Sequence, residues 1–350
     1  VLACFAPKPC LALCDDADFF PIEGTIDAIA EGKRLYALLG AEDRVSMTVD
    51  HSTHAYTPVL AERAAAFFAR ELNGEERERD AAALTPLPGH EMNCTREGQI
   101  RAAFPDARFI FDENRERTLA LSRGLTTADA AAFVREKTDA FRRPVPLHVR
   151  ELPWHYASGI AGRAYFWFAQ ERMPNYAILL REAASAALPR PVTICLFDRG
   201  TDDIAAQSVL LHTVLRAGSA ALVLDLSGIG KCAPDSYREG DIHGPFGTLD
   251  TITKNLFFLG DSLCALRLFE LERALEVVRG IPGCGKVSVC ARGNSGILAH
   301  LFSLLHPDIA LDVADTQRIS DVVLRRYYEE YDLEGFMLPG IAPYAVALGF

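Results

Sequence analysis

Hydrophobic positions near the start of the chain follow two spacings in turn, one typical of strands and one typical of helices. Short apolar runs at 10–14 and 45–49 predict strands. Apolar residues at intervals of three and four over 25–39 and 58–73 predict amphipathic helices, and a glycine follows each of them. The order strand, helix, strand, helix is that of a parallel α/β unit.

A second set of elements follows the stretch 75–90, which is first charged and then rich in proline and glycine and so indicates a surface linker. Strands are predicted at 164–168, 177–180, 192–197, 220–226, 286–290 and 309–313. Helices are predicted at 126–141, 204–216, 262–279 and 296–305, and the long helix at 262–279 is expected to be amphipathic. The expected fold class is therefore α/β, with parallel-sheet units and flanking helices. The expected parts are 1–74, a linker region at 75–130 and a second domain at 131–350.

The composition excludes some classes of function and leaves others open. With 350 residues, of which 49% are hydrophobic, the chain can bury a large core. The net charge of -11 and the lack of a basic run argue against nucleic acid as a partner. No segment approaches roughly 18 consecutive apolar residues, so no membrane span is expected. The cellular localisation and the oligomeric state stay open.

Nine cysteines are spread singly along the chain, with no CxxC pair. Several of them, such as Cys14, Cys195 and Cys290, lie in apolar strand-like runs. A chain of this length does not need disulfides for stability, so most of the cysteines are interpreted as buried thiols. His300 and His306 lack a spacing typical of metal ligands, and an interaction with the helix end is expected for His306. No metal site is expected.

Two glycine-rich segments resemble phosphate-binding loops but lack residues or a following helix that such loops require. In GIPGCGKV the position after the lysine is Val287 instead of serine or threonine, and a strand follows where a helix is needed. The segment SGIGKC follows a strand, but it lacks a third glycine and no helix is predicted after it. We therefore expect no nucleotide and no other cofactor.

An aspartate and a histidine follow the two predicted strands of the first part. Asp18 lies in DFFPIEGT, and about 36 residues later DHSTHAY contains His51 and His54. In α/β hydrolases the triad acid and the triad histidine follow different strands, after the nucleophile in the sequence. The histidine takes the proton of the nucleophile, and the carboxylate orients the ring. Spacing alone leaves a second interpretation open, in which Asp18 is a turn or cap residue and His54 a surface histidine.

Four motifs in the first 74 residues occur in a characteristic order. They are AP-x-P before the first strand, D-x-FPIEGT after it, LLGAED before the second strand and H-x-Y-x-P at the last helix. In this order they resemble the C-terminal end of acetylxylan-esterase-like α/β hydrolases. The resemblance implies that Asp18 is the triad acid and that His54 is the triad base. His51 is not at the matching position.

The segment KVSVCARGNSGILAH has the strand–turn–helix form of a nucleophile elbow but not its residues. An elbow has the pattern G-x-S-x-G, because small neighbours let the strained turn expose the hydroxyl. Here Ala291 takes the first glycine position, Gly293 the serine position and Ser295 the second glycine position. Ser295 is therefore a poor candidate for a nucleophile, and we expect it to cap the following helix.

The region 92–350 resembles the degenerate second half of tandem proteins in the same group. The resemblance rests on the order of NCTREGQI, LFDRG, LDLSGIG, LGDSL and ARGNSGILAH. It implies a fragment that holds the end of one hydrolase domain and the start of another, with the catalytic serine upstream of Val1. Both units would then be incomplete, and we expect the strands at 10–14 and 45–49 to pair apart from the strand at 309–313. In the alternative, one of these two strands pairs with the strand at 309–313, which would give a circularly permuted hydrolase-like domain.

The resemblance implies hydrolysis of a carboxylic ester in the parent protein. The substrate would be a small molecule or a polysaccharide that carries an acetyl ester. We expect the chain alone to be inactive, since it lacks a nucleophile. The alternative is a non-catalytic hydrolase-like scaffold, or a module that binds carbohydrate or a partner protein, and glycine at position 293 favours this alternative for the second domain.

Overall fold

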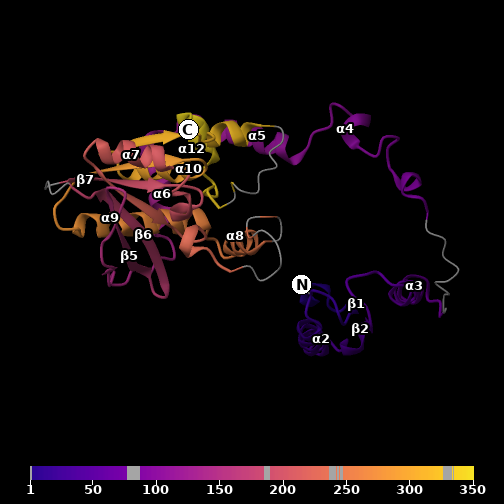
Figure 1. Cartoon of the computed structure of the whole chain (residues 1–350). Coiled ribbons are helices and arrows are strands. Elements are labelled where there is room, and N and C mark those ends of the chain that lie inside the picture. The colour runs from indigo at the N-terminus through magenta and orange to yellow at the C-terminus, as the bar shows by residue number, and fades with distance from the viewer. Residues whose placement is uncertain are drawn as a thin grey trace. The chain divides into compact units, whose positions relative to one another are not determined.

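The chain divides into two compact units, Val1–Ala107 and Arg108–Phe350, and the boundary falls inside the stretch that was expected to be a linker. Figure 1 shows the computed structural model. It describes the following residues: 2–76, 87–184, 190–235, 242, 244, 247–325, 333 and 335–350. Residues 77–86, which include most of the charged part of the predicted linker, lie outside the described residues.

The first unit is a small parallel α/β unit, as the sequence pattern predicts. Its elements are α1 (Leu2–Phe5), β1 (Cys10–Asp15), α2 (Ile22–Ala37), η1 (Glu42–Arg44), β2 (Val45–Asp50), α3 (Pro58–Asn73), η3 (Gly89–Met92) and α4 (Ile100–Ala103). β1 and β2 pair in parallel, with Cys10 opposite Val45 and Asp15 opposite Asp50. Ile29, Tyr36 and Val45 form its buried core. The carboxyl ends of both strands therefore meet at one edge.

The ends of α3 lie where the sequence signals them. The Thr57 side chain accepts a hydrogen bond from the Leu60 amide, and Pro58 is the first helical residue. Gly74 ends the helix with a φ of 67°. A left-handed residue at this position is most easily a glycine, because glycine has no Cβ to clash.

The second unit is built around an eight-stranded sheet (Figure 1). Its strands are β3 (Arg150–Glu151), β4 (His155–Ala157), β5 (Ile160–Gln170), β6 (Met173–Glu182), β7 (Arg190–Leu196), β8 (Ala220–Asp225), β9 (Cys284–Arg292) and β10 (Ala310–Ala314). Its helices are α5 (Ile110–Leu121), α6 (Thr127–Asp139), η4 (Gly200–Asp203), α7 (Ser208–Arg216), η5 (Gly230–Cys232), α8 (Thr248–Phe258), α9 (Leu263–Gly280), α10 (Ser295–Leu305), α11 (Ile319–Leu324) and α12 (Ala342–Leu348).

The strand order in this sheet is β10-β9-β7-β8-β6-β5-β3, with β4 beside β5. β10, β9, β7 and β8 are parallel, as expected. The strands from β6 to β3 run antiparallel to their neighbours. β5 and β6 are strands, as the hydrophobic pattern predicts, but they run antiparallel to their neighbours and do not continue the expected parallel sheet. The fold class is α/β, as predicted.

Side chains of β7 alternate between the two faces of the sheet. Ile194 and Leu196 belong to the large core that α9 and α10 share. Cys195 and Phe197 belong to a smaller core, where Leu211 and Leu215 of α7 cover the other face. Helices therefore lie on both faces, which explains why the sequence of β7 is a continuous apolar run.

The prediction that 262–279 is an amphipathic helix is wrong in one respect. The helix is present as α9 and is capped by Ser262, but fourteen of its residues are buried. Contacts with the sheet and with α6, α8 and α10 surround it. Arg267 and Glu270, which suggest a polar face in the sequence, are also buried. A helix that is enclosed on all sides does not need a polar face.

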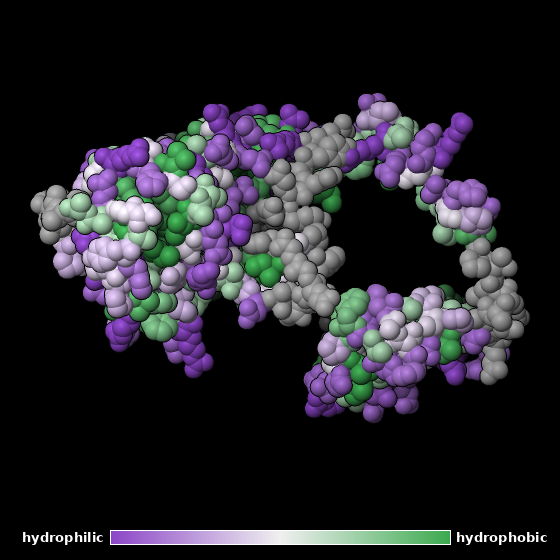
Figure 2. All heavy atoms as spheres, viewed as in Figure 1, coloured by the Kyte–Doolittle hydropathy of each residue, from purple (hydrophilic) through white to green (hydrophobic). Residues whose placement is uncertain are grey.

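Each unit has strands that pair within it. In the described residues, β1 pairs with β2, and β10 pairs with β9. The surface of each unit mixes polar and apolar residues, as Figure 2 shows for one face. Of the helices in the described ranges, none is long and apolar enough to span a membrane.

Cysteine burial differs from the prediction. All nine thiols are free, and three of them, Cys195, Cys264 and Cys290, are buried. Cys4 and Cys94 are exposed, and the other four are half-buried. The interpretation of most cysteines as buried thiols is therefore wrong. Cys4 and Cys94 belong to the first unit and lie outside the buried cluster of Ile29, Tyr36 and Val45.

Candidate functional site

The aspartate and the histidine that the sequence singles out form a hydrogen-bonded pair. Asp18 follows β1, His54 follows β2, and the parallel register brings the two following loops to the same edge. The Nδ1 atom of His54 lies 2.8 Å from Oδ2 of Asp18. The two side chains therefore lie within hydrogen-bonding distance. With Nδ1 engaged as the donor, the neutral ring leaves Nε2 free to accept a proton.

The two members of this pair differ in their exposure to solvent. The Asp18 side chain is 12% exposed, and the His54 side chain is 60% exposed. Desolvation raises the pKa of Asp18, but hydrogen bonds from His54 and from the Phe20 and Phe19 amides outweigh it and hold the pKa below its ordinary value. Asp18 is therefore the charged partner of the imidazole at neutral pH.

Two exposed aromatic rings flank His54. The Phe19 ring centroid lies 4.4 Å from that of His54, and the Phe20 centroid lies 6.0 Å away. Both phenylalanines are more than half exposed. They form an apolar rim beside the imidazole, which suits the approach of an uncharged group.

A second acid–histidine pair, which the sequence analysis did not find, lies on the same loops. The Nδ1 atom of His51 lies 2.8 Å from Oδ2 of Asp16. Asp16 and Asp18 are two residues apart, and His51 and His54 are three apart, so neighbouring positions on both loops pair. The signal was present in the sequence, because DHSTH contains both histidines and DDAD contains both aspartates. The hydrogen bond to Asp16 and the charge of Asp16 raise the pKa of His51.

We expect Asp16→Asn to lower the pKa of His51 towards that of a free imidazole. The substitution removes the carboxylate that favours the protonated ring and keeps the side-chain shape. Following the imidazole resonances by NMR as the pH is varied measures the change. Asp312→Asn, which alters a carboxylate in the other unit, is the control and should leave the titration unchanged. An unaltered His51 titration in Asp16→Asn would contradict the pairing.

Two further carboxylates hold the loop that carries both histidines. Asp50 Oδ2 accepts a hydrogen bond of 2.6 Å from the Thr57 hydroxyl, and Asp50 Oδ1 accepts one from the His51 amide. Asp15 is buried and accepts a hydrogen bond from the Ala55 amide. The loop between β2 and α3 is thus fixed at both ends and in its middle, which positions His54 without enclosing it.

Gly293 lies at a strand–turn–helix junction with the backbone of an elbow. It follows β9, precedes α10 and has a φ of 72°. In a hydrolase elbow, the amide of the residue after the nucleophile helps to form the oxyanion hole. The corresponding amide here belongs to Asn294. The strand–turn–helix form that the sequence predicts is therefore present, and a glycine occupies its turn.

The amides of this turn are occupied by a carboxylate of the chain itself. Asp198, just after β7, accepts hydrogen bonds from the Asn294 amide (3.0 Å) and the Ser295 amide (2.7 Å). A Cβ added at Gly293 would overlap the Asp198 carboxylate. In the sequence, LFDRG is only a point of resemblance, and no role is predicted for Asp198. An aspartate directly after a buried strand was the available signal.

Ser295 does not cap the helix that it was expected to cap. It is the first residue of α10 and is 1% exposed. Its hydroxyl oxygen has no hydrogen-bond partner among the described residues. The Asp198 carboxylate satisfies the helix amides in its place, which leaves the serine hydroxyl enclosed and away from solvent. This burial agrees with the expectation that Ser295 is a poor candidate for a nucleophile.

One glycine of SGIGKC, Gly230, and one glycine of LFDRG, Gly200, lie against a buried carboxylate of the chain itself. Asp225, fully buried at the end of β8, accepts hydrogen bonds from the Thr201 amide (2.6 Å), the Thr201 hydroxyl (2.7 Å) and the Lys231 amide (2.8 Å). Burial raises the pKa of Asp225, and these donors oppose the rise. A Cβ at Gly200 or Gly230 would overlap the carboxylate. These glycines therefore make room for Asp225.

The other segments and residues considered as candidates from the sequence have structural roles. GIPGCGKV runs from the end of α9 into β9. The Nε2 atom of His306 lies 3.0 Å from Glu272, which also pairs with Arg135, so its partner is a carboxylate and not the helix end. The part of the chain that the structure describes contains no group of three or more side chains suited to hold a metal.

No family model and no curated protein matches the sequence. Solved structures similar to the chain include a protein from Bacteroides fragilis assigned as an acetyl xylan esterase, with 13% identity over 62% of this chain and 59% of that chain, at a TM-score of 0.43. An acetyl xylan esterase from a Paenibacillus species has 15% identity over 54% and 59%, at a TM-score of 0.37. A glucuronoyl esterase from Solibacter usitatus has 14% identity over 51% and 54%, at a TM-score of 0.36.

This chain thus spans less than two thirds of the length of these three proteins. Likenesses of this size concern the backbone fold and not the chemistry. The chemistry of the chain follows from its own residues.

Proposed function

We propose that the first unit supplies the acid and the base of a serine-type carboxylic-ester hydrolase, with Asp18 as the acid and His54 as the base. The observation that carries the proposal is the 2.8 Å hydrogen bond between His54 Nδ1 and Asp18 at the carboxyl edge of β1 and β2. It leaves Nε2 of an exposed ring available to a nucleophile. His51 is paired in the same way, but its place in the motif does not match that of the triad base.

In this mechanism the Nε2 atom of His54 takes the proton of a serine hydroxyl as the oxygen attacks the ester carbonyl. The protonated ring, stabilised by the Asp18 carboxylate, then gives the proton to the departing alcohol. A water molecule releases the acyl group by the same two proton transfers in reverse. The Phe19 and Phe20 rings beside the imidazole would contact the uncharged acyl or alcohol part of the ester.

We do not place the catalytic serine of this mechanism in the second unit. Gly293 stands at the elbow, and the Asp198 carboxylate holds the two amides that would stabilise an oxyanion. A resident negative charge at this place repels the transition state that an oxyanion hole stabilises. We therefore propose that the second unit is a non-catalytic hydrolase-like domain, and that the chain alone does not hydrolyse activated esters at enzymatic rates.

The proposed substrate class is an acetyl ester, and a polysaccharide is its proposed carrier. This part of the proposal rests on the resemblance of the first 74 residues to acetylxylan-esterase-like hydrolases. Nothing in the described residues of the first unit selects one sugar over another.

The proposal is tested by exchanging the acid-and-histidine segment of an acetyl xylan esterase for residues 2–76 of this chain. We expect the chimera to hydrolyse p-nitrophenyl acetate, and His54→Ala to lower its kcat/KM by about 1,000-fold, in the range of lost general-base catalysis. Asp18→Asn should also lower it strongly, because the amide does not stabilise the charged ring.

His51→Ala and Asp16→Asn are matched controls, because they break the neighbouring pair on the same loops. We expect them to keep kcat/KM within about threefold. A folded chimera that is insensitive to His54→Ala, or one that loses activity equally with His51→Ala, would refute the assignment. The unaltered chain, assayed in parallel, should show no turnover that Ser295→Ala abolishes.

A further inference from the structure

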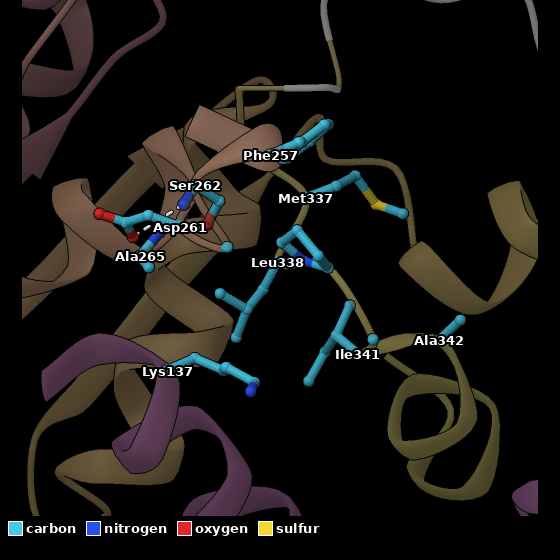
Figure 3. Close-up of a pocket in the computed structure, with 12 residues that line it drawn as sticks. Lys137, Phe257, Asp261, Ser262, Ala265, Met337, Leu338, Ile341 and Ala342 are labelled. Carbon is cyan, nitrogen blue, oxygen red and sulfur yellow. Dashed lines mark hydrogen bonds between the residues drawn. The ribbon is translucent and has the colours of Figure 1, made fainter. Parts of the chain in front are cut away.

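A cavity in the second unit has no residue of the Gly293 turn in its lining and is not explained by the proposed function. It has a volume of about 410 Å³ and is bounded by α6, by the turn between α8 and α9 and by residues 337–342 (Figure 3). Leu338 and Ile341 are fully buried and form its inner wall. Phe257 and Pro339 are exposed, which places its opening at the surface. The volume lies near the lower end of the range for small-molecule pockets.

Most of the wall is apolar, and the polar groups are few. The side chains of Phe257, Ala265, Met337, Leu338 and Ile341 supply the apolar surface. A pocket of this kind binds the hydrocarbon part of a ligand by excluding water from it, while the few polar groups decide which head group is accepted.

One of the two charged side chains at the cavity is neutralised within the protein. Asp261 Oδ1 accepts a hydrogen bond of 2.5 Å from the Arg142 guanidinium and another from the Ser262 amide. The side chains of Asp261 and Arg142 are both almost fully buried. A buried pair with additional hydrogen bonds keeps its geometry, so Asp261 does not present a free charge to a ligand.

The other charged side chain, Lys137, is available. It extends from α6 into the space in front of Ile341 (Figure 3). Its ammonium is 2.9 Å from Glu136, whose side chain is 70% exposed. An ion pair between exposed side chains of adjacent residues contributes little and exchanges readily with other partners. The ammonium also lies 5.5 Å from the Phe133 ring, which holds the side chain near the opening.

We propose that this cavity binds a small aliphatic monocarboxylate, with its chain against Met337, Leu338 and Ile341 and its carboxylate on the Lys137 ammonium. An alkyl ammonium does not fit, because the anionic group of the cavity is already paired with Arg142. A neutral alcohol would fill the same apolar wall but would gain no ion pair. The site does not depend on Asp18 or His54.

The experiment measures the binding of octanoate to the full chain by isothermal titration calorimetry, with 1-octanol and octylammonium as neutral and cationic probes of the same length. We expect octanoate to bind to one site about tenfold more tightly than 1-octanol, and octylammonium more weakly than either. Lys137→Met, which keeps the length of the side chain, should weaken octanoate about tenfold and leave 1-octanol unchanged. Lys286→Met, at an exposed position on β9, is the matched control and should leave both affinities unchanged.

A second pair of variants locates the hydrocarbon chain. Ala342→Phe fills the cavity and should weaken octanoate and 1-octanol at least tenfold, and Met337→Ala should weaken both about threefold while leaving the inner wall intact. The proposal is overturned if octanoate does not bind, if Lys137→Met binds octanoate as tightly as the unaltered chain, or if octylammonium binds best. It is also overturned if neither cavity variant changes the affinity.

Discussion

Gly293→Ser is expected to destabilise the second unit by about 3 kcal/mol, although serine is the residue that a hydrolase elbow has at this position. Two effects add. A serine at a φ of 72° is strained by about 1 kcal/mol. Its Cβ would also displace the Asp198 carboxylate from the Asn294 and Ser295 amides. The loss of two charge-assisted hydrogen bonds at a helix N-terminus costs about 2 kcal/mol.

A double-mutant cycle in urea separates the two effects. Asp198→Ala alone should lower the free energy of unfolding by about 2 kcal/mol, since α10 loses its capping carboxylate. In the Asp198→Ala background, Gly293→Ser should cost only about 1 kcal/mol, which leaves a coupling of about 2 kcal/mol. Additive effects would show that the carboxylate and the turn do not interact. Neither single variant should gain esterase activity.

Gly200→Ala is expected to destabilise the second unit by about 4 kcal/mol. Gly200 has a φ of 55°, and a Cβ there would overlap Asp225 Oδ1 and lie 2.9 Å from Ile229. Unlike Asp198, Asp225 is fully buried, so its carboxylate cannot turn towards water. Displacing it would leave the Thr201 and Lys231 amides without their acceptor inside the protein.

Gly218→Ala is the matched control, because Gly218 also has a positive φ but nothing lies within 4 Å of an added Cβ. We expect it to cost about 1 kcal/mol, the strain of the left-handed backbone alone. Urea unfolding of the full chain, followed by the fluorescence of buried Trp167, measures both variants. Equal losses of stability at the two glycines would contradict the role of Asp225.

Local signals in the sequence predicted the elements well where short-range chemistry decides their ends. The helix at 58–73 was predicted to the residue, because Thr57, Pro58 and Gly74 act on adjacent positions. The helix predicted at 204–216 begins later, at Ser208, and a 3-10 turn at 200–203 precedes it. This turn positions Thr201 beside Asp225. Contacts that decide such a turn lie far away in the sequence.

The same distinction applies to the site. Asp18 and His54 could be paired from the sequence, because parallel strands bring successive loops to one edge and the motifs resemble a known family. The role of Asp198 could not be predicted from the sequence, since its hydrogen-bond partners lie 96 and 97 positions further along the chain. The cavity beside Lys137 joins three segments from α6 to residue 342, and the spacing of apolar residues does not reveal that they meet.

The Asp198 carboxylate also constrains how the sequence of this turn can change. A serine that appeared first at position 293 would collide with the carboxylate and destabilise the protein. Removal of Asp198 first would leave α10 without its capping carboxylate. Each single step is disadvantageous, so a side chain can enter position 293 only together with a change at position 198.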